Sequence, residues 1–213
     1  MVRRCYDLKL QTFVHANGDA AIDMLLEAHE RAAAGDRACD RRTVAIHSQF
    51  VRPDQLDRYV ADRIIPSFFT EHAYYFGAAH LANRGQAQAS FLSPMKTALA
   101  RGLRPTNHTD FVVTPIDQMM VLWTAVTRKS LTGEVIGPGE RVTPMEALEA
   151  ITINAAYQYR EEATKGSIEP GKLADLVILD RNPMTVDPDA IRDIRVLETI
   201  KEGRTIYRRE SLR

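Results

Sequence analysis

The sequence contains little cysteine and no excess of either charge. Cys5 and Cys39 are its two cysteines in 213 residues, which is too few for a disulfide framework and typical of a reducing compartment. Lysine plus arginine and aspartate plus glutamate each total 28, so the formal net charge is zero. Such a chain has no general electrostatic attraction for nucleic acid or anionic lipid, and we expect neither nucleic acid nor a membrane as a partner.

Long apolar runs are also missing. No stretch approaches the roughly 18 consecutive apolar residues that suggest a membrane span. Arg3, Arg4 and Asp7 interrupt the region in which the apolar part of a signal sequence would lie. Together with the low cysteine content, these features predict a cytoplasmic protein.

What the chain does contain is an alternation of short β-rich runs and longer helical patterns, which is typical of parallel βα units. Strands are expected at residues 8–14, 43–46, 64–69 and 103–107, and helices at 20–34, 53–62 and 94–99. Two further helices are expected to begin at Thr114-Pro115 and at Thr143-Pro144. In the second of these, Glu146 completes a capping box with Thr143.

The alternation of strand and helix patterns ends after about residue 164, where Gly166, Pro170 and Gly171 follow. Short apolar runs follow at 175–179, 194–200 and 205–207. The segment between the last two runs includes Gly203, which is typical of a hairpin with a glycine turn. We therefore expect a βα region over 1–164 and a smaller β-unit over 165–213.

Residues that can bind a metal follow three of the expected strands. His15, His47 and Asp110 each stand where such a strand ends. In a parallel barrel these ends converge on one mouth, where catalytic residues lie. Two imidazoles and a carboxylate at the mouth could bind a divalent metal such as zinc. The carboxylate could also accept a proton from water whose pKa the metal lowers.

Each of these residues also has a purely structural interpretation. A single histidine after an apolar run is more often a hydrogen-bonded core or loop residue, and Asp110 could cap a turn. The repetition of one pattern at successive strand ends favours the metal site over these alternatives.

Other conspicuous residues are expected to be structural. Asp19 is placed to cap the helix that follows it. Trp123 and the neighbouring Met119 and Met120 lie on one helical stripe and are expected in the core. Arg128 and Lys129 are expected on a solvated face.

Longer phrases of the sequence resemble a known family. They are VHANGDAAID, AIHSQF, NHTDFVVTP, TPMEALEAITINAAYQ, KGSIEPGKLADLVILDRNP and VLETIKEGRTIY. Together they resemble the C-terminal portion of family 3 of the amidohydrolase superfamily, the group that includes N-substituted formamide deformylases. The resemblance extends from near residue 8 to near residue 208.

The resemblance implies a fold, an activity and roles for particular residues. Members have a (β/α)8 TIM-type barrel and a small β-sandwich, so this chain would supply barrel strands 5 to 8 and part of the sandwich. They break carbon–nitrogen bonds other than peptide bonds with metal-activated water, here in a small amide or formamide-like molecule. By this resemblance His15, His47 and Asp110 bind the metal, Asp110 also handles the proton, and His72 and His108 face the substrate.

The sequence departs from the family pattern in two places. Members carry a His-x-His pair on strand 1 and a bridging lysine or acidic group on strand 4, but this chain has no His-x-His and little room before Leu8. Ala78 follows Gly77 where members often have an acidic residue. We therefore expect a fragment that is inactive alone. The alternative is a non-catalytic interaction module that pairs with itself or with a missing N-terminal half.

Overall fold

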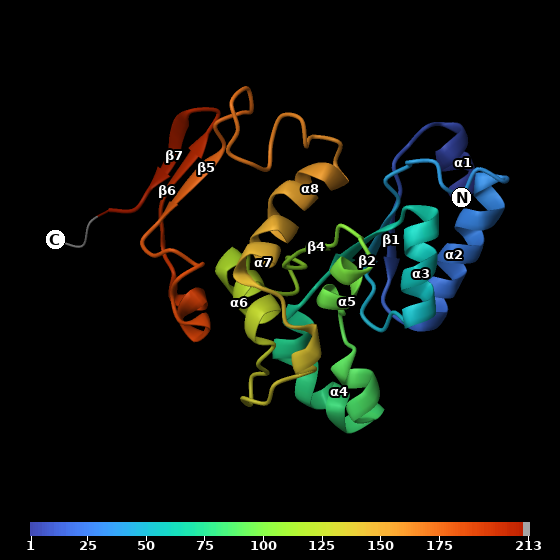
Figure 1. Cartoon of the computed structure of the whole chain (residues 1–213), viewed down its shortest axis with the longest axis horizontal. Helices are drawn as coiled ribbons and strands as arrows, with labels where there is room; N and C mark the ends of the chain where they lie inside the picture. The colour runs from blue at the N-terminus through green and yellow to red at the C-terminus, as the bar shows by residue number, and fades with distance from the viewer. Residues whose placement is uncertain (211–213) are drawn as a thin grey trace.

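The computed structural model describes residues 1–210, which form a parallel sheet flanked by helices and a separate antiparallel sheet (Figure 1). The parallel sheet consists of β1 (Phe13–Ala16), β2 (Val44–His47), β3 (Ile65–Phe68) and β4 (Thr106–Asn107), in that order. Each strand pairs with the next strand in chain order, as repeated βα units require. The predicted α/β class is therefore confirmed.

Helices connect these strands. Along the chain, the helices before β4 are α1 (Val2–Asp7), α2 (Asp19–Ala33), α3 (Pro53–Asp62), α4 (Glu71–Ser90) and α5 (Met95–Ala100). After β4 come α6 (Gln118–Thr127), the 3₁₀ turn η1 (Pro138–Glu140), α7 (Pro144–Ile151) and α8 (Ile153–Gln158). The sequence pattern predicts neither α1 nor α4. None of the helices within residues 1–210 is both long enough and apolar enough to cross a membrane.

The start of α7 follows from local side-chain chemistry. The Thr143 hydroxyl accepts a hydrogen bond from the Glu146 amide at 3.2 Å, and the Glu146 carboxylate accepts one from the Thr143 amide at 2.7 Å. Each side chain thus satisfies an amide that the helix leaves without a partner. The predicted capping box is confirmed.

Two helices begin at residues other than those predicted or have a different cap residue. The prediction of a helix start at Thr114-Pro115 is wrong: α6 begins at Gln118, because the Asp117 carboxylate accepts from its first amides at 3.0 and 3.2 Å. The prediction that Asp19 caps α2 is also wrong, since Gly18 holds the cap position and Asp19 is the first helical residue. Its carboxylate still complements the positive end of the helix.

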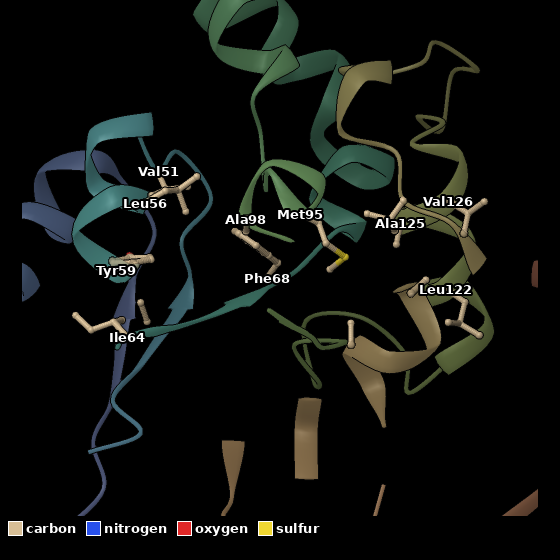
Figure 2. Packing of buried hydrophobic residues seen from close by; sticks show 14 of the residues in the cluster. Val51, Leu56, Tyr59, Ile64, Phe68, Met95, Ala98, Leu122, Ala125 and Val126 are labelled. Atoms are coloured by element: carbon tan, nitrogen blue, oxygen red, sulfur yellow. The ribbon is translucent and has the colours of Figure 1, made fainter. Parts of the chain in front are cut away.

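The main core lies between the parallel sheet and its helices. Figure 2 shows Phe68 of β3 and Met95 of α5 between side chains of α3, including Tyr59, and side chains of α6, including Leu122. All four side chains are buried. Burying a side chain of this size stabilises the fold by about 1.5–3 kcal/mol, so this cluster holds the strand ends in place.

Residues in and after α6 test the predictions about burial. Trp123 and Met119 are buried, as predicted for the core. The prediction for Arg128 is wrong, because its side chain is 0% exposed and donates hydrogen bonds to three backbone carbonyl groups. Lys129 lies at the surface and pairs with Asp189 at 2.6 Å.

The second sheet comes entirely from residues after 164. It consists of β5 (Leu176–Leu179), β6 (Val196–Lys201) and β7 (Arg204–Arg208), which pair antiparallel in that order, and the 3₁₀ turn η2 (Pro188–Asp193) precedes β6. Glu202 and Gly203 connect β6 to β7 with φ values of 49° and 75°. Positive φ at both positions is typical of the tight hairpin turn that matches strand twist. The predicted hairpin is confirmed.

Candidate metal centre

The register of the parallel sheet sets the position of the predicted site. One row across the sheet is made by the last residue of each strand, namely Ala16, His47, Phe68 and Asn107. His15 immediately precedes this row, and His108 and Asp110 closely follow it. His72 lies in the first turn of α4, just beyond β3. The five predicted site residues therefore meet at one edge of the sheet.

His47 lies at the centre of this group. Its ring centroid is 4.7 Å from that of His15, 5.1 Å from that of His108 and 5.5 Å from that of His72. Its Nε2 atom is 3.9 Å from the Oδ2 atom of Asp110. The structure thus brings four imidazoles and one carboxylate together.

Three of these residues form a compact group of potential metal ligands. One ligand atom each of His47, His108 and Asp110 lie within 4.8 Å of one another. Zinc binds histidine nitrogen and carboxylate oxygen at about 2.0–2.2 Å, so a single ion needs only a small adjustment to contact all three. His15 lies beside His47 but outside this compact group.

The hydrogen bonds of His108 favour a different role for that ring. The backbone amide of Asp110 donates to His108 Nδ1 at 3.1 Å. A neutral imidazole that accepts at Nδ1 carries its hydrogen on Nε2, and this Nε2 is buried with no hydrogen-bond partner in the described part of the chain. His108 is therefore arranged to donate a hydrogen bond, which suits a substrate oxygen better than a metal.

His47 is arranged differently. Its Nδ1 atom is also buried without a partner within residues 1–210, and no backbone amide fixes its tautomer. A buried polar atom without a partner is costly. The other ring nitrogen, Nε2, lies 3.9 Å from Oδ2 of Asp110 and is the atom placed to share an ion with that carboxylate. The nitrogen and oxygen donors of His47 and Asp110, with the ring of His15 beside them, fit zinc or a similar divalent ion.

Burial favours the neutral form of three of these imidazoles, those of His47, His72 and His108. Burial lowers the pKa of His47, although the nearby Asp110 carboxylate opposes this effect. Burial is the largest of the causes that lower the pKa of His72 to about 2 and that of His108 to about 4, and neighbouring histidines contribute to both shifts. A neutral imidazole is the form that binds metal or accepts a hydrogen bond.

The backbone at the site is unusual. His47, Ser48 and Asp110 have φ values of 71°, 45° and 53°, in the left-handed region that residues other than glycine seldom adopt. Conformations of this kind persist where the surrounding structure enforces them, and they cluster at functional sites.

Sequence reasoning overlooked Glu71, which directly precedes His72. Its side chain is 1% exposed, and its Oε1 atom has no hydrogen-bond partner within residues 1–210. Burial raises the pKa of Glu71 to about 7. The available signal was its position: like Asp110, it is an acidic residue soon after the end of a buried strand.

Comparisons with known proteins identify relatives of this chain. The model of the amidohydrolase family matches residues 1–207. The chain is 31% identical over 210 residues to the N-substituted formamide deformylase of Arthrobacter pascens, covering 97% of this chain and 38% of that protein. It is also 31% identical over 202 residues to the protein LONG AFTER FAR-RED 3 of Arabidopsis thaliana, covering 93% of this chain and 34% of that protein.

Solved structures similar to this chain include a metal-dependent hydrolase and a zinc-containing deaminase. A metal-dependent hydrolase of Pyrococcus furiosus matches with a TM-score of 0.71 and 30% identity, over 86% of this chain and 36% of the other. An adenosine deaminase of Xanthomonas campestris with bound zinc matches with a TM-score of 0.67 and 16% identity, over 96% and 48% of the two chains, which shows a shared fold. The chain thus spans well under two thirds of the length of each of these relatives. By its family match over residues 1–207, it belongs to the amidohydrolase family.

Proposed function

We propose that the chain is the C-terminal part of a metal-dependent amidohydrolase that breaks a carbon–nitrogen bond other than a peptide bond. The observation that carries this proposal is the convergence of His47, Asp110 and three further imidazoles at the ends of parallel strands. The name of the Arthrobacter relative supports a small amide or formamide-like substrate. The low cysteine content supports a cytoplasmic location.

In this proposal His15, His47 and Asp110 hold a divalent ion, with zinc as the first candidate. The ion supplies Lewis-acid polarisation and lowers the pKa of water. Asp110 accepts the proton that the attacking water releases and passes it to the leaving nitrogen as the carbon–nitrogen bond breaks. His108 donates from Nε2 to the substrate oxygen, and His72 contacts the substrate beside His47.

The four parallel strands correspond in this proposal to strands 5 to 8 of a (β/α)8 barrel, within a region 1–164 that precedes a β-sandwich segment 165–213. Apolar side chains are exposed on the outer strand β1 and in the segment that follows β4. Phe13 of β1 is 39% exposed, and Phe111 and Val112 after β4 are 64% and 79% exposed. Parallel sheets are normally covered on their faces and edges, so we propose that an N-terminal half completes the barrel and adds metal ligands.

The residues present should therefore hold metal weakly. Three ligands leave a site more open than that of the complete enzyme, and metal affinity depends on the whole ligand set. We expect the chain alone to show little hydrolysis.

The same exposed edges favour a second candidate function. A non-catalytic interaction module would use them to pair with another copy of this chain or with a separate N-terminal half. This candidate predicts a dimer in size-exclusion chromatography and no stoichiometric metal binding.

Zinc titration by calorimetry tests the metal site directly. We expect the chain to bind one zinc ion, and we expect His47→Gln and Asp110→Asn each to weaken binding by about tenfold or more. Asp36→Asn, in an exposed loop away from the site, is the matched control and should bind as the unsubstituted chain does. Equal affinities in all four proteins would contradict the metal centre, and a dimer without bound zinc would favour the interaction module.

A further inference from the structure

One face of α4 leads outward from the metal centre. His72, Phe76, His80 and Arg84 are spaced four residues apart, so each lies beside the next along the surface of the helix. The ring of Phe76 is 6.2 Å from that of His72 and 6.4 Å from that of His80. In Figure 1, α4 lies at the lower edge of the view, below the parallel strands. The inner end of this face touches His47.

The outer end of the same face packs on the segment that follows β2. The Nε2 atoms of His80 and Gln49 are 2.7 Å apart in a hydrogen bond. The ring of Phe50 lies 5.1 Å from that of His80 and 4.2 Å from the guanidinium carbon of Arg84. Phe50 is three residues beyond His47, and three residues span at most about 11 Å. This contact therefore lies within reach of an elongated ligand bound at His47.

A pocket of about 330 Å³ opens here, which we call the rim pocket. Phe50 and Phe91 contribute apolar walls, and Arg84 and Gln88 contribute polar groups. This combination of apolar lining and few polar groups is typical of small-molecule sites, and the volume is at the lower end of their range. Asp19, in the first turn of α2, also lines the pocket. The pocket therefore lies near the carboxyl ends of the parallel strands, where His47 also lies.

The charges around the rim pocket leave one cation available. Arg52, also in the lining, is held by Asp23 and Asp54 at 3.0 Å and by Asp19 at 3.7 Å. Arg84, by contrast, has no carboxylate within 4.0 Å in the described part of the chain. A guanidinium that lies over an aromatic ring keeps its edge free to donate two parallel hydrogen bonds to a carboxylate.

We propose that the rim pocket binds the apolar, carboxylate-ended tail of the substrate whose amide reaches the metal centre. The inference rests on the proposed function and adds a substrate class: amides that carry a carboxylate at the far end of an apolar chain. Arg84 is the residue that determines this specificity. The apolar tail lies between Phe50 and Phe91.

Binding of 4-phenylbutyrate to the metal-free chain tests the pocket alone. We expect 4-phenylbutan-1-ol, which lacks the charge, to bind about tenfold more weakly. Arg84→Gln should remove this difference, and Arg84→Lys should retain part of it. Arg63→Gln removes an equal charge from an exposed position elsewhere and should change nothing. Equal binding of acid and alcohol, or an unchanged preference in Arg84→Gln, would overturn the proposal.

A second probe, 6-formamidohexanoate, tests the link to the metal centre. With zinc present, it should shift the NMR signals of both the Phe50 ring and the His47 ring, whereas 4-phenylbutyrate should shift only those of Phe50. If neither signal responds, the substrate class is wrong even where zinc binds as proposed. If zinc fails to bind while 4-phenylbutyrate still binds through Arg84, the proposed function fails and the carboxylate pocket stands.

Discussion

Replacing Glu71 with glutamine should change how the stability of the protein depends on pH. Glu71 is buried in the first turn of α4, and burial is the main cause that raises its pKa from 4.5 to about 7. The Thr114 hydroxyl opposes this change, and the negative charge of Asp117 adds to it. In the unfolded chain the carboxyl group is exposed and returns to its ordinary pKa.

The sign and size of the effect follow from proton linkage. Between pH 4.5 and about 7 the folded state keeps the proton on Glu71 and the unfolded state does not. The free energy of unfolding therefore decreases as pH rises through this window. Each tenfold change in proton affinity corresponds to about 1.4 kcal/mol, so the total decrease from this residue is about 3 kcal/mol.

Urea denaturation at pH 5, 6, 7 and 8 measures the effect. Glutamine resembles the protonated acid and does not ionise, so Glu71→Gln should be more stable than the unsubstituted chain by less than about 1 kcal/mol at pH 5 and by about 3 kcal/mol at pH 8. Glu27→Gln, at an exposed position on α2, should show no such gain. A difference between Glu71→Gln and the unsubstituted chain that stays constant from pH 5 to 8 would refute the reasoning.

Two further substitutions test the packing. Arg128→Met removes three hydrogen bonds and leaves buried carbonyl groups without donors, so it should lower the free energy of unfolding by about 3 kcal/mol or more; a thermal midpoint equal to that of the unsubstituted chain would contradict this. Thr143→Ala removes one half of the capping box and should cost about 1 kcal/mol in urea denaturation, whereas Thr132→Ala, in an exposed loop, should cost less.

Local signals were sufficient for much of the fold. The helix 53–62 and the capping box at Thr143 depend on neighbouring residues alone. The wrong prediction of a helix start at Thr114 shows that a helix start depends on the residue three positions later. Three residues after Thr143 stands Glu146, which reaches back to the cap, but three residues after Thr114 stands the shorter Asp117. Its carboxylate instead accepts from the amides that follow it and begins α6 there.

Features that depend on distant segments could not be read from the sequence. Arg128 is buried because residues 92–93 and Ile136 bring carbonyl groups to its guanidinium, and nothing near it in the chain indicates this. The helix α4 contains Gly85 at φ 75° and ψ 169°, and its exposed and buried residues follow no simple apolar stripe. Its order therefore depends on contacts with the rest of the molecule.

The histidine pair at the centre of the site shows where strand alternation fails. His15 pairs with Ile46 and Ala16 pairs with His47. Paired residues of neighbouring parallel strands face the same side, and successive residues alternate between sides. Regular strands would therefore put the rings of His15 and His47 on opposite faces of the sheet.

The left-handed backbone at the end of β2 removes this conflict. His47 has a φ of 71° and Ser48 a φ of 45°, so the strand geometry ends at His47 and its side chain leaves the alternation. Its ring then comes within 4.7 Å of the His15 ring, centroid to centroid. Ala16, the residue paired with His47, packs into the core with Ala45 on the other face. The left-handed conformation of His47 thus allows two adjacent strands to place their histidine rings side by side while the small residues beside them remain in the core.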